Sequence, residues 1–263
     1  MHENRFYKDH WITIGQERLD RYQRMFEWSP ASKVFYEAAD IQAGHIVAEF
    51  GCGPGHTAIE IAGWVGPDGH VHALDINATF VAQTQENVRK ARLPGRVTAH
   101  ESDGSKLPLP DGSLDRVTTK NTLIYVDDPM VTFGEFKRVL RPGGKVHAIE
   151  GDWPMMVVEP VPTKAWQALA SAAAHVCRTP EIGRKLTGLL ARSGFRDIEV
   201  QVITQPDMEG RLLPMIKNMA GYARDGGDMA NEEIDGILST LDQALTEKTY
   251  LVLAPQFVVT GLR

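Results

Sequence analysis

The sequence predicts an α/β protein built around one doubly wound, mostly parallel sheet. Three observations support this prediction. Strand and helix patterns alternate from residue 45 to residue 151, a glycine-rich turn joins the first strand of this series to its first helix, and the second strand ends in an aspartate. Alternation of this kind is typical of a parallel sheet with helices on both faces.

The elements of this region follow one another closely. Strands are expected at residues 45–50, 70–75, 96–101, 114–119 and 145–151. Helices are expected at residues 56–65, 78–91 and 130–140. Between the third and fourth strands, prolines and glycines indicate a loop.

The segments outside this region are mainly helical. Residues 1–40 are rich in aromatic side chains, with helices expected at 16–28 and 32–40, and these either pack on the sheet edge or form an N-terminal lid; we predict the lid. After residue 152, helices are expected at 163–177, 180–192, 210–224 and 231–247, and strands at 197–204 and 256–262. We therefore predict a seven-stranded sheet in a domain spanning residues 41–263, with helical cap insertions at about 153–177 and 205–250.

Composition and charge limit the classes of function. The chain has 263 residues, 43% hydrophobic and 24% charged, which is ordinary for a globular protein. Its net charge of −6 argues against a nucleic-acid partner, which usually requires a basic face. No apolar run approaches the roughly 20 residues that cross a bilayer. Two isolated cysteines, Cys52 and Cys177, predict neither a metal site nor a disulfide framework, so a cytoplasmic location is expected.

The glycine turn and the aspartate point to a cofactor. The turn, from Glu49 to Gly55, reads EFGCGPG, and its glycines allow a sharp bend and the close approach of a ligand. Asp75, at the end of the second strand, can accept hydrogen bonds from both hydroxyls of a ribose. Together they predict a nucleoside-containing cofactor. The G-x-G-x-G spacing and the N–H that Pro54 lacks both argue against a nicotinamide dinucleotide.

The same turn resembles motif I of the class I SAM-dependent methyltransferases, particularly the group similar to ubiquinone and menaquinone biosynthesis methyltransferases. Further segments resemble this family in order: residues 101–104 (ESDG), 107–115 (LPLPDGSLD), 120–129 and 138–144 (RVLRPGG). The resemblance is dense from residue 41 to residue 153 and weaker beyond. It implies a Rossmann-like fold and S-adenosyl-L-methionine (SAM) as the cofactor.

The resemblance also implies which residues bind the cofactor. These are Glu49, Gly51, Cys52 and Gly53 around the methionine part, Asp75 at the ribose, Ile76, Asp103 and Gly104 at the adenine, and Lys120 and Asn121 beside the sulfonium. Tyr125 stands where many relatives have a histidine, so a mechanism that uses that histidine is not transferred to this chain.

Catalysis of methyl transfer from SAM depends mainly on aligning the acceptor with the methyl group. The methyl group of SAM is already activated, so the protein must orient the acceptor and exclude water. A general base is needed only where the acceptor keeps its proton. Asp152 and Tyr125 follow the fifth and fourth strands, where such sheets bind ligands, and are our candidate catalytic residues. Weaker candidates are His10, His56 and His175.

We therefore predict an enzyme that moves the methyl group of SAM to a C, N or O nucleophile of a small molecule. Several alternatives stay open. One is a SAM-binding protein that does not methylate, either a binding module or a SAM-assisted cyclase. The others are a nicotinamide-dependent oxidoreductase and a methyltransferase acting on protein or RNA. The sequence indicates no membrane partner, and it leaves the acceptor and the oligomeric state open.

Overall fold

A computed structural model describes residues 6–263 and contains a seven-stranded sheet with the order β3-β2-β1-β4-β5-β9-β7. Its strands are β1 (Ile46–Phe50), β2 (His70–Asp75), β3 (Val97–Glu101), β4 (Leu114–Lys120), β5 (Leu140–Gly151), β7 (Arg196–Ile203) and β9 (Gln256–Leu262). The strands β1 to β5 pair in parallel, whereas β9 is antiparallel to both β5 and β7. The predicted fold class, a mostly parallel seven-stranded Rossmann-like sheet, is confirmed.

The order of the strands places a ligand-binding crevice. Strand β1 pairs with β2 on one side and with β4 on the other, so the chain runs outward from β1 to β3 and then crosses back to β4 on the opposite side. In open sheets of this kind, ligands bind outside the carboxyl ends of the strands at this reversal. The segments that follow β1, β2, β4 and β5 are therefore the ones to examine for a site.

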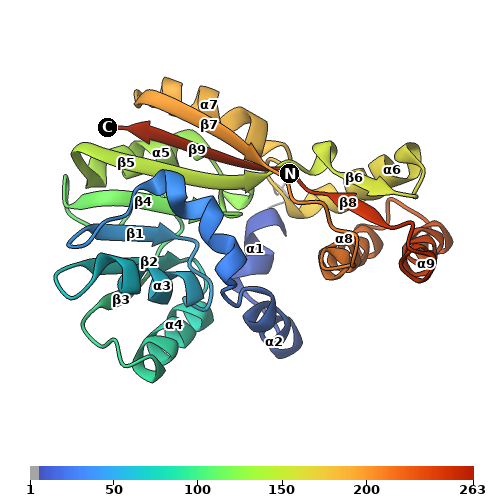
Figure 1. The fold of residues 1–263 in the computed structure, drawn as a ribbon, viewed down its shortest axis with the longest axis horizontal. Coiled ribbons are helices and arrows are strands. Elements are labelled where there is room, and N and C mark those ends of the chain that lie inside the picture. Colours follow the sequence, from blue (N-terminus) through green and yellow to red (C-terminus); the bar gives the residue numbers. More distant parts are fainter. Residues whose placement is uncertain (1–5) are drawn as a thin grey trace.

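Helices cover both faces of the sheet (Figure 1). These are α3 (His56–Val65), α4 (Ala78–Lys90), α5 (Pro129–Val139) and α7 (Ile182–Arg192). Val47 of β1 and Val71 of β2 pack with α3. Ala48 of β1 and Leu74 of β2 belong instead to the larger core that contains α5 and α7. Alternate strand residues thus enter different cores, as expected for strands buried on both faces.

The N-terminal segment contains α1 (Phe6–Ile12), α2 (Gln16–Met25) and a 3₁₀ helix, η1 (Pro30–Ala39). The last two lie where helices were expected, but α1 was not predicted. Leu19 and Tyr22 of α2 pack against Phe80 of α4, and Tyr36 of η1 packs against Ile149. Figure 1 shows α1 and α2 beside the ends of the central strands, on the side of the predicted crevice.

The remaining elements lie beyond the end of the large sheet (Figure 1). They are β6 (Val157–Glu159), α6 (Thr163–Ala173), α8 (Leu213–Gly226), α9 (Asn231–Glu247) and β8 (Leu251–Leu253), with short 3₁₀ helices η3 (Trp153–Met155) and η4 (Ala174–Val176). The pairing of β6 with β8 into a second, two-stranded sheet was not predicted. Within residues 6–263, no helix is long and apolar enough to cross a membrane.

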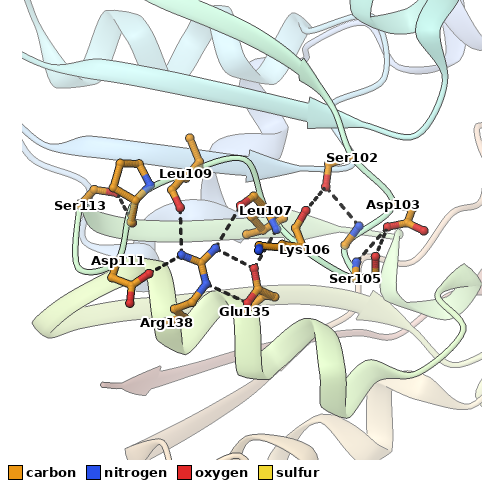
Figure 2. A network of polar contacts seen from close by, with 12 residues as sticks. Ser102, Asp103, Ser105, Lys106, Leu107, Leu109, Asp111, Ser113, Glu135 and Arg138 are labelled. Carbon is orange, nitrogen blue, oxygen red and sulfur yellow. Dashed lines mark hydrogen bonds and ion pairs between the residues drawn. The ribbon is translucent and has the colours of Figure 1, made fainter.

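A loop, not a helix, joins β3 to β4, and one arginine fastens it to α5 (Figure 2). Arg138 donates hydrogen bonds to the carbonyl oxygens of Leu109 (2.9 Å) and Leu107 (3.0 Å) and pairs with Asp111 (2.6 Å). Glu135, one turn earlier on α5, holds Arg138 and accepts the N–H of Leu107 (2.8 Å). Because Asp103 lies in the same loop, this network also fixes one wall of the crevice.

We predict that Arg138→Ala lowers the free energy of unfolding by about 2 kcal/mol, because buried carbonyl oxygens and Glu135 lose a charged donor. Urea unfolding measures this change. The control is Arg89→Ala, since Arg89 forms only an exposed pair with Glu86 and its loss should leave the urea midpoint unchanged. Equal midpoints for the two variants would contradict the role assigned to Arg138.

Candidate cofactor-binding site

The glycine turn between β1 and α3 has the backbone that its sequence predicts. Gly51, Gly53 and Gly55 have φ values of +78°, +52° and +80°. The N–H groups of Gly51 and Cys52 both donate to the carbonyl oxygen of Leu74, at 2.7 and 2.9 Å. A Cβ on Gly51 would lie 2.0 Å from Oγ1 of Thr122. The turn is therefore tied to β2 and is in close contact with the segment after β4.

Asp75 joins this turn to the start of α4. Its Oδ2 accepts the N–H of Gly53 (2.8 Å), and its Oδ1 accepts the N–H of Asn77 (2.9 Å). Asn77 in turn caps α4 by accepting the N–H of Phe80 (3.0 Å). Asp75 is 9% exposed, and burial raises its pKa to about 6 against the hydrogen bonds that lower it. A carboxylate is thus held rigidly beside the glycine turn.

A hollow of about 510 Å³ lies at the carboxyl ends of β2 and β3. It is lined by Lys8, Ile12, Ile76, Glu101, Ser102, Asp103 and Lys106. Asp103 accepts hydrogen bonds from the N–H and hydroxyl of Ser105 (3.0 and 2.6 Å) and pairs with Lys8 of α1 (3.0 Å). Although burial opposes it, these donors lower the pKa of Asp103 to about 2. The predicted adenine residues Ile76 and Asp103 thus share one hollow, and α1 supplies part of its wall.

Glu49 and Lys120 lie at the ends of the neighbouring strands β1 and β4. Glu49 is buried, and its Oε2 has no hydrogen-bond partner within residues 6–263. Burial raises the pKa of Glu49 to about 8. Burial also lowers the pKa of Lys120, and the nearby charge of Glu49 partly offsets this decrease. An unpaired carboxylate oxygen at this position fits a ligand group that donates hydrogen bonds, such as an ammonium.

The other predicted cofactor residues are held by packing or by their backbone conformation. The side chain of Cys52 packs in the core under α3, so only its main chain can face a ligand. A Cβ on Gly104 would lie 2.6 Å from Cζ of Phe50. Asn121 has a positive φ of 51° and donates its N–H to the carbonyl oxygen of Ile149 (2.9 Å).

The two candidate catalytic residues have different surroundings. Asp152 is 1% exposed and forms a two-bond ion pair with Arg184 of α7 (2.6 and 2.5 Å). Tyr125 ends a 3₁₀ helix, η2 (Leu123–Tyr125), and its ring contacts those of His10 and Trp11 in α1. Burial raises the pKa of Tyr125 well above its usual value. The catalytic roles of both residues stay predictions.

Glu150 is a residue that the sequence reasoning missed. It is fully buried at the end of β5, and its Oε1 accepts the N–H groups of Thr122 (2.8 Å) and Leu123 (2.6 Å). Burial raises its pKa to about 8. It therefore positions the segment that contacts Gly51. The signal for it was a single acidic residue directly after the apolar pair Ala148 and Ile149 in a predicted central strand.

Comparisons with known proteins agree with this geometry. Residues 47–144 match the family model described as a methyltransferase domain. A demethylmenaquinone methyltransferase of Lactobacillus johnsonii is 31% identical over 136 residues, which is 52% of this chain and 54% of that protein. An uncharacterized 37.1 kDa protein in a transposon of Streptomyces fradiae is 33% identical over 172 residues, 65% of this chain and 49% of that protein. The chain thus spans about half the length of these curated relatives.

Solved structures share the fold. Phosphoethanolamine N-methyltransferase 2 of Haemonchus contortus, in complex with S-adenosyl-L-methionine, superposes with a TM-score of 0.65 at 17% identity and covers 98% of this chain and 60% of that one. Residues 47–144 thus match a methyltransferase domain, and the chain has the fold of the class I, SAM-dependent methyltransferases. Within this class, the chain is similar to the demethylmenaquinone methyltransferases. The prediction of SAM as cofactor is thereby confirmed at the level of family and fold.

We predict that Gly51→Ala destabilises the protein by at least about 2 kcal/mol, because the new Cβ meets Thr122 and the positive φ disfavours alanine. Urea unfolding measures the change. Gly63→Ala is the matched control, since Gly63 lies inside α3 with open space around it, and alanine there should stabilise by roughly 0.5–1 kcal/mol. A Gly51→Ala variant as stable as the wild type would show that Thr122 does not hold the turn.

Proposed function

We propose that the protein transfers the methyl group of SAM to a C, N or O nucleophile of a small molecule. The observation that carries the proposal is the buried carboxylate of Asp75, held by main-chain N–H groups beside the glycine turn at the strand reversal. An anionic acceptor fixed in this position suits the two hydroxyls of a ribose.

The residues around Asp75 fit the rest of the cofactor. Ile76 and Asp103 line the hollow that would hold the adenine. The unpaired Oε2 of Glu49 would accept a hydrogen bond from the amino group of the methionine part, beside the main chain of Gly51 and Gly53. When bound, SAM supplies a methyl group activated by a sulfonium.

We propose that residues 1–40 act as a lid on a domain formed by residues 41–263, with cap insertions at about 153–177 and 205–250. Three contacts of the described lid support this division of roles. Lys8 pairs with both Asp103 (3.0 Å) and Asp127 (2.6 Å), and the hydroxyls of Tyr22 and Tyr222 are 2.6 Å apart. The lid is thereby attached to the cofactor side and to the cap, and it would exclude water from the reacting groups.

Tyr125 and Asp152 remain our candidate catalytic residues. Because burial raises the pKa of Tyr125, its hydroxyl stays protonated at neutral pH and would donate a hydrogen bond to the acceptor. The carboxylate of Asp152 is oriented by its ion pair with Arg184, and it would accept a hydrogen bond from the acceptor. The positioning of the acceptor by surrounding side chains then accounts for most of the rate.

The named relatives support a small-molecule acceptor. Demethylmenaquinone and phosphoethanolamine, which appear in the names of one curated relative and one solved structure, are both small molecules. A SAM-binding protein that does not methylate would bind the cofactor in the same way. A product assay with radiolabelled SAM separates the two alternatives, because only the methyltransferase moves the label to an acceptor.

We predict that the purified protein binds SAM and S-adenosylhomocysteine, but not NADH, when the three are titrated in parallel by calorimetry. Asp75→Asn should weaken S-adenosylhomocysteine binding at least about tenfold, because a charged acceptor of hydrogen bonds is lost. Asp68→Asn, in an exposed turn, is the control with the same change of charge. Selective NADH binding by the wild type would overturn the proposed function.

The affinity for S-adenosylhomocysteine should also depend on pH through Asp75. Its raised pKa of about 6 means that the carboxylate is ionised at pH 7.5 and mostly protonated at pH 5. Since the ribose hydroxyls donate to the ionised form, affinity should fall below pH 6, by at most about tenfold per pH unit. Calorimetry from pH 7.5 to 5 measures the profile. The same decline in Asp75→Asn would assign the titration to another group.

A further inference from the structure

The lid contains buried polar atoms that lack partners. Residues 6–263 supply no hydrogen-bond partner for Nε2 of His10, Nε1 of Trp11, or Nε and Nη2 of Arg18. Native proteins pair the great majority of such atoms, so each exception requires an explanation. Together with Nε of Arg21, these atoms lie within twelve residues of the lid, and this clustering suggests a common cause.

These atoms belong to side chains that pack around the same aromatic rings. The rings of His10 and Trp11 lie 5.1 Å apart, and they approach the ring of Tyr125 to 5.9 and 5.0 Å. The guanidinium of Arg18 lies over Trp11, 5.8 Å from its ring centroid, and over Tyr22 at 5.5 Å. Arg18 also donates from Nη1 to the carbonyl oxygen of His10 (3.1 Å). The lid therefore gathers these groups beside a candidate catalytic residue.

Nε2 of His10 is a hydrogen-bond acceptor. The other ring nitrogen, Nδ1, contacts the carbonyl oxygen of Phe6, which can only accept, so Nδ1 carries the proton. The ring is 6% exposed, and its burial lowers the pKa of His10 to about 4. The imidazole is therefore neutral at pH 7, with an unused lone pair on Nε2.

The other unpaired atoms are donors. Nε and Nη2 of Arg18 form one edge of the guanidinium, and this edge binds a carboxylate or phosphate through two parallel hydrogen bonds. No salt bridge joins Arg18 to an acidic side chain among the described residues. The indole N–H of Trp11 can only donate. Three donors and one acceptor match an oxyanion that carries, or adjoins, a hydroxyl or N–H.

We propose that Arg18, Trp11 and His10 form a subsite for the polar head of the methyl acceptor, whose oxyanion pairs with Arg18 and Trp11 while a neighbouring hydroxyl or N–H donates to His10. This inference rests on the proposed function. The subsite faces Tyr125 and Tyr222, which belong to η2 and α8, and not the hollow at Ile76 and Asp103. Its occupant is therefore assigned as the acceptor and not the cofactor.

Simple probes test the charge requirement. Protein saturated with S-adenosylhomocysteine is titrated by calorimetry with phenyl phosphate, salicylate, benzoate and the neutral benzamide. We expect the oxyanions to bind, benzamide to bind at least tenfold more weakly, and salicylate, which carries a hydroxyl, to bind more tightly than benzoate. Failure of every oxyanion to bind at millimolar concentration would overturn the proposal.

Variants test the residues. Arg18→Gln should weaken phenyl phosphate binding at least tenfold and change the affinity for S-adenosylhomocysteine less than twofold. His10→Phe should remove the preference for salicylate over benzoate. Arg24→Gln, an exposed position on the same helix, should change neither affinity. Arg18→Lys keeps the charge but not the planar edge, so its affinity for phenyl phosphate should lie between those of the wild type and Arg18→Gln. This variant serves as the test if Arg18→Gln does not fold.

The outcomes separate this inference from the proposed function. An equal loss of S-adenosylhomocysteine and phenyl phosphate binding in Arg18→Gln would assign Arg18 to the cofactor and overturn the acceptor subsite. Unchanged phenyl phosphate binding in both Arg18 variants would overturn it as well. By contrast, a wild-type protein that binds no S-adenosylhomocysteine would refute the proposed function itself.

Discussion

The site depends on one carboxylate bound by main-chain N–H groups. Asp75 accepts from Gly53 in the turn after β1 and from Asn77 at the start of α4. Asn77 also donates to the carbonyl oxygens of Trp11 (2.7 Å) and Ile12 (3.3 Å), which brings α1 against the same point. Two strands, one helix and the lid are thus aligned by a short chain of hydrogen bonds. All of these hydrogen bonds lie within the protein, so the fold itself holds the carboxylate in place, as preorganisation requires.

Local patterns explain why much of this could be predicted. The ends of α3, β2, α9 and β9 agree with the sequence, because glycines, strand alternation and amphipathic periodicity are local signals. The glycine turn and the position of Asp75 at the end of β2 were predicted for the same reason. Strands β6 and β8 have three residues each, which is too few for an alternation of apolar and polar residues to be recognised. They form because they pair with each other. In β5, the strand was expected to begin only at residue 145, yet Leu140 pairs with Leu114 of β4.

The contacts of the lid are long-range and left little trace in the sequence. Tyr22 contacts Tyr222, and Lys8 pairs with Asp103 and Asp127. These partners are so far apart in the sequence that a local sequence pattern does not reveal them. Asp152 illustrates the same limit, because its position after β5 indicated a candidate base but not its pairing with Arg184. Sequence patterns therefore suffice to propose cofactor residues, whereas the contacts of the lid and of Asp152 depend on tertiary packing.

The place of β9 in the sheet has a consequence for how the chain reaches its fold. Among the described residues, strand β7 pairs only with β9, and β9 lies between β5 and β7. During translation, β7 emerges before its partner exists, and α8 and α9 must be synthesised before residues 256–262 can be inserted. Until then, the edges of β5 and β7 have unpaired main-chain groups, which are open to pairing with other chains. This half of the sheet can close only late in synthesis, and a ribosome that stalls before residue 256 would leave both edges open.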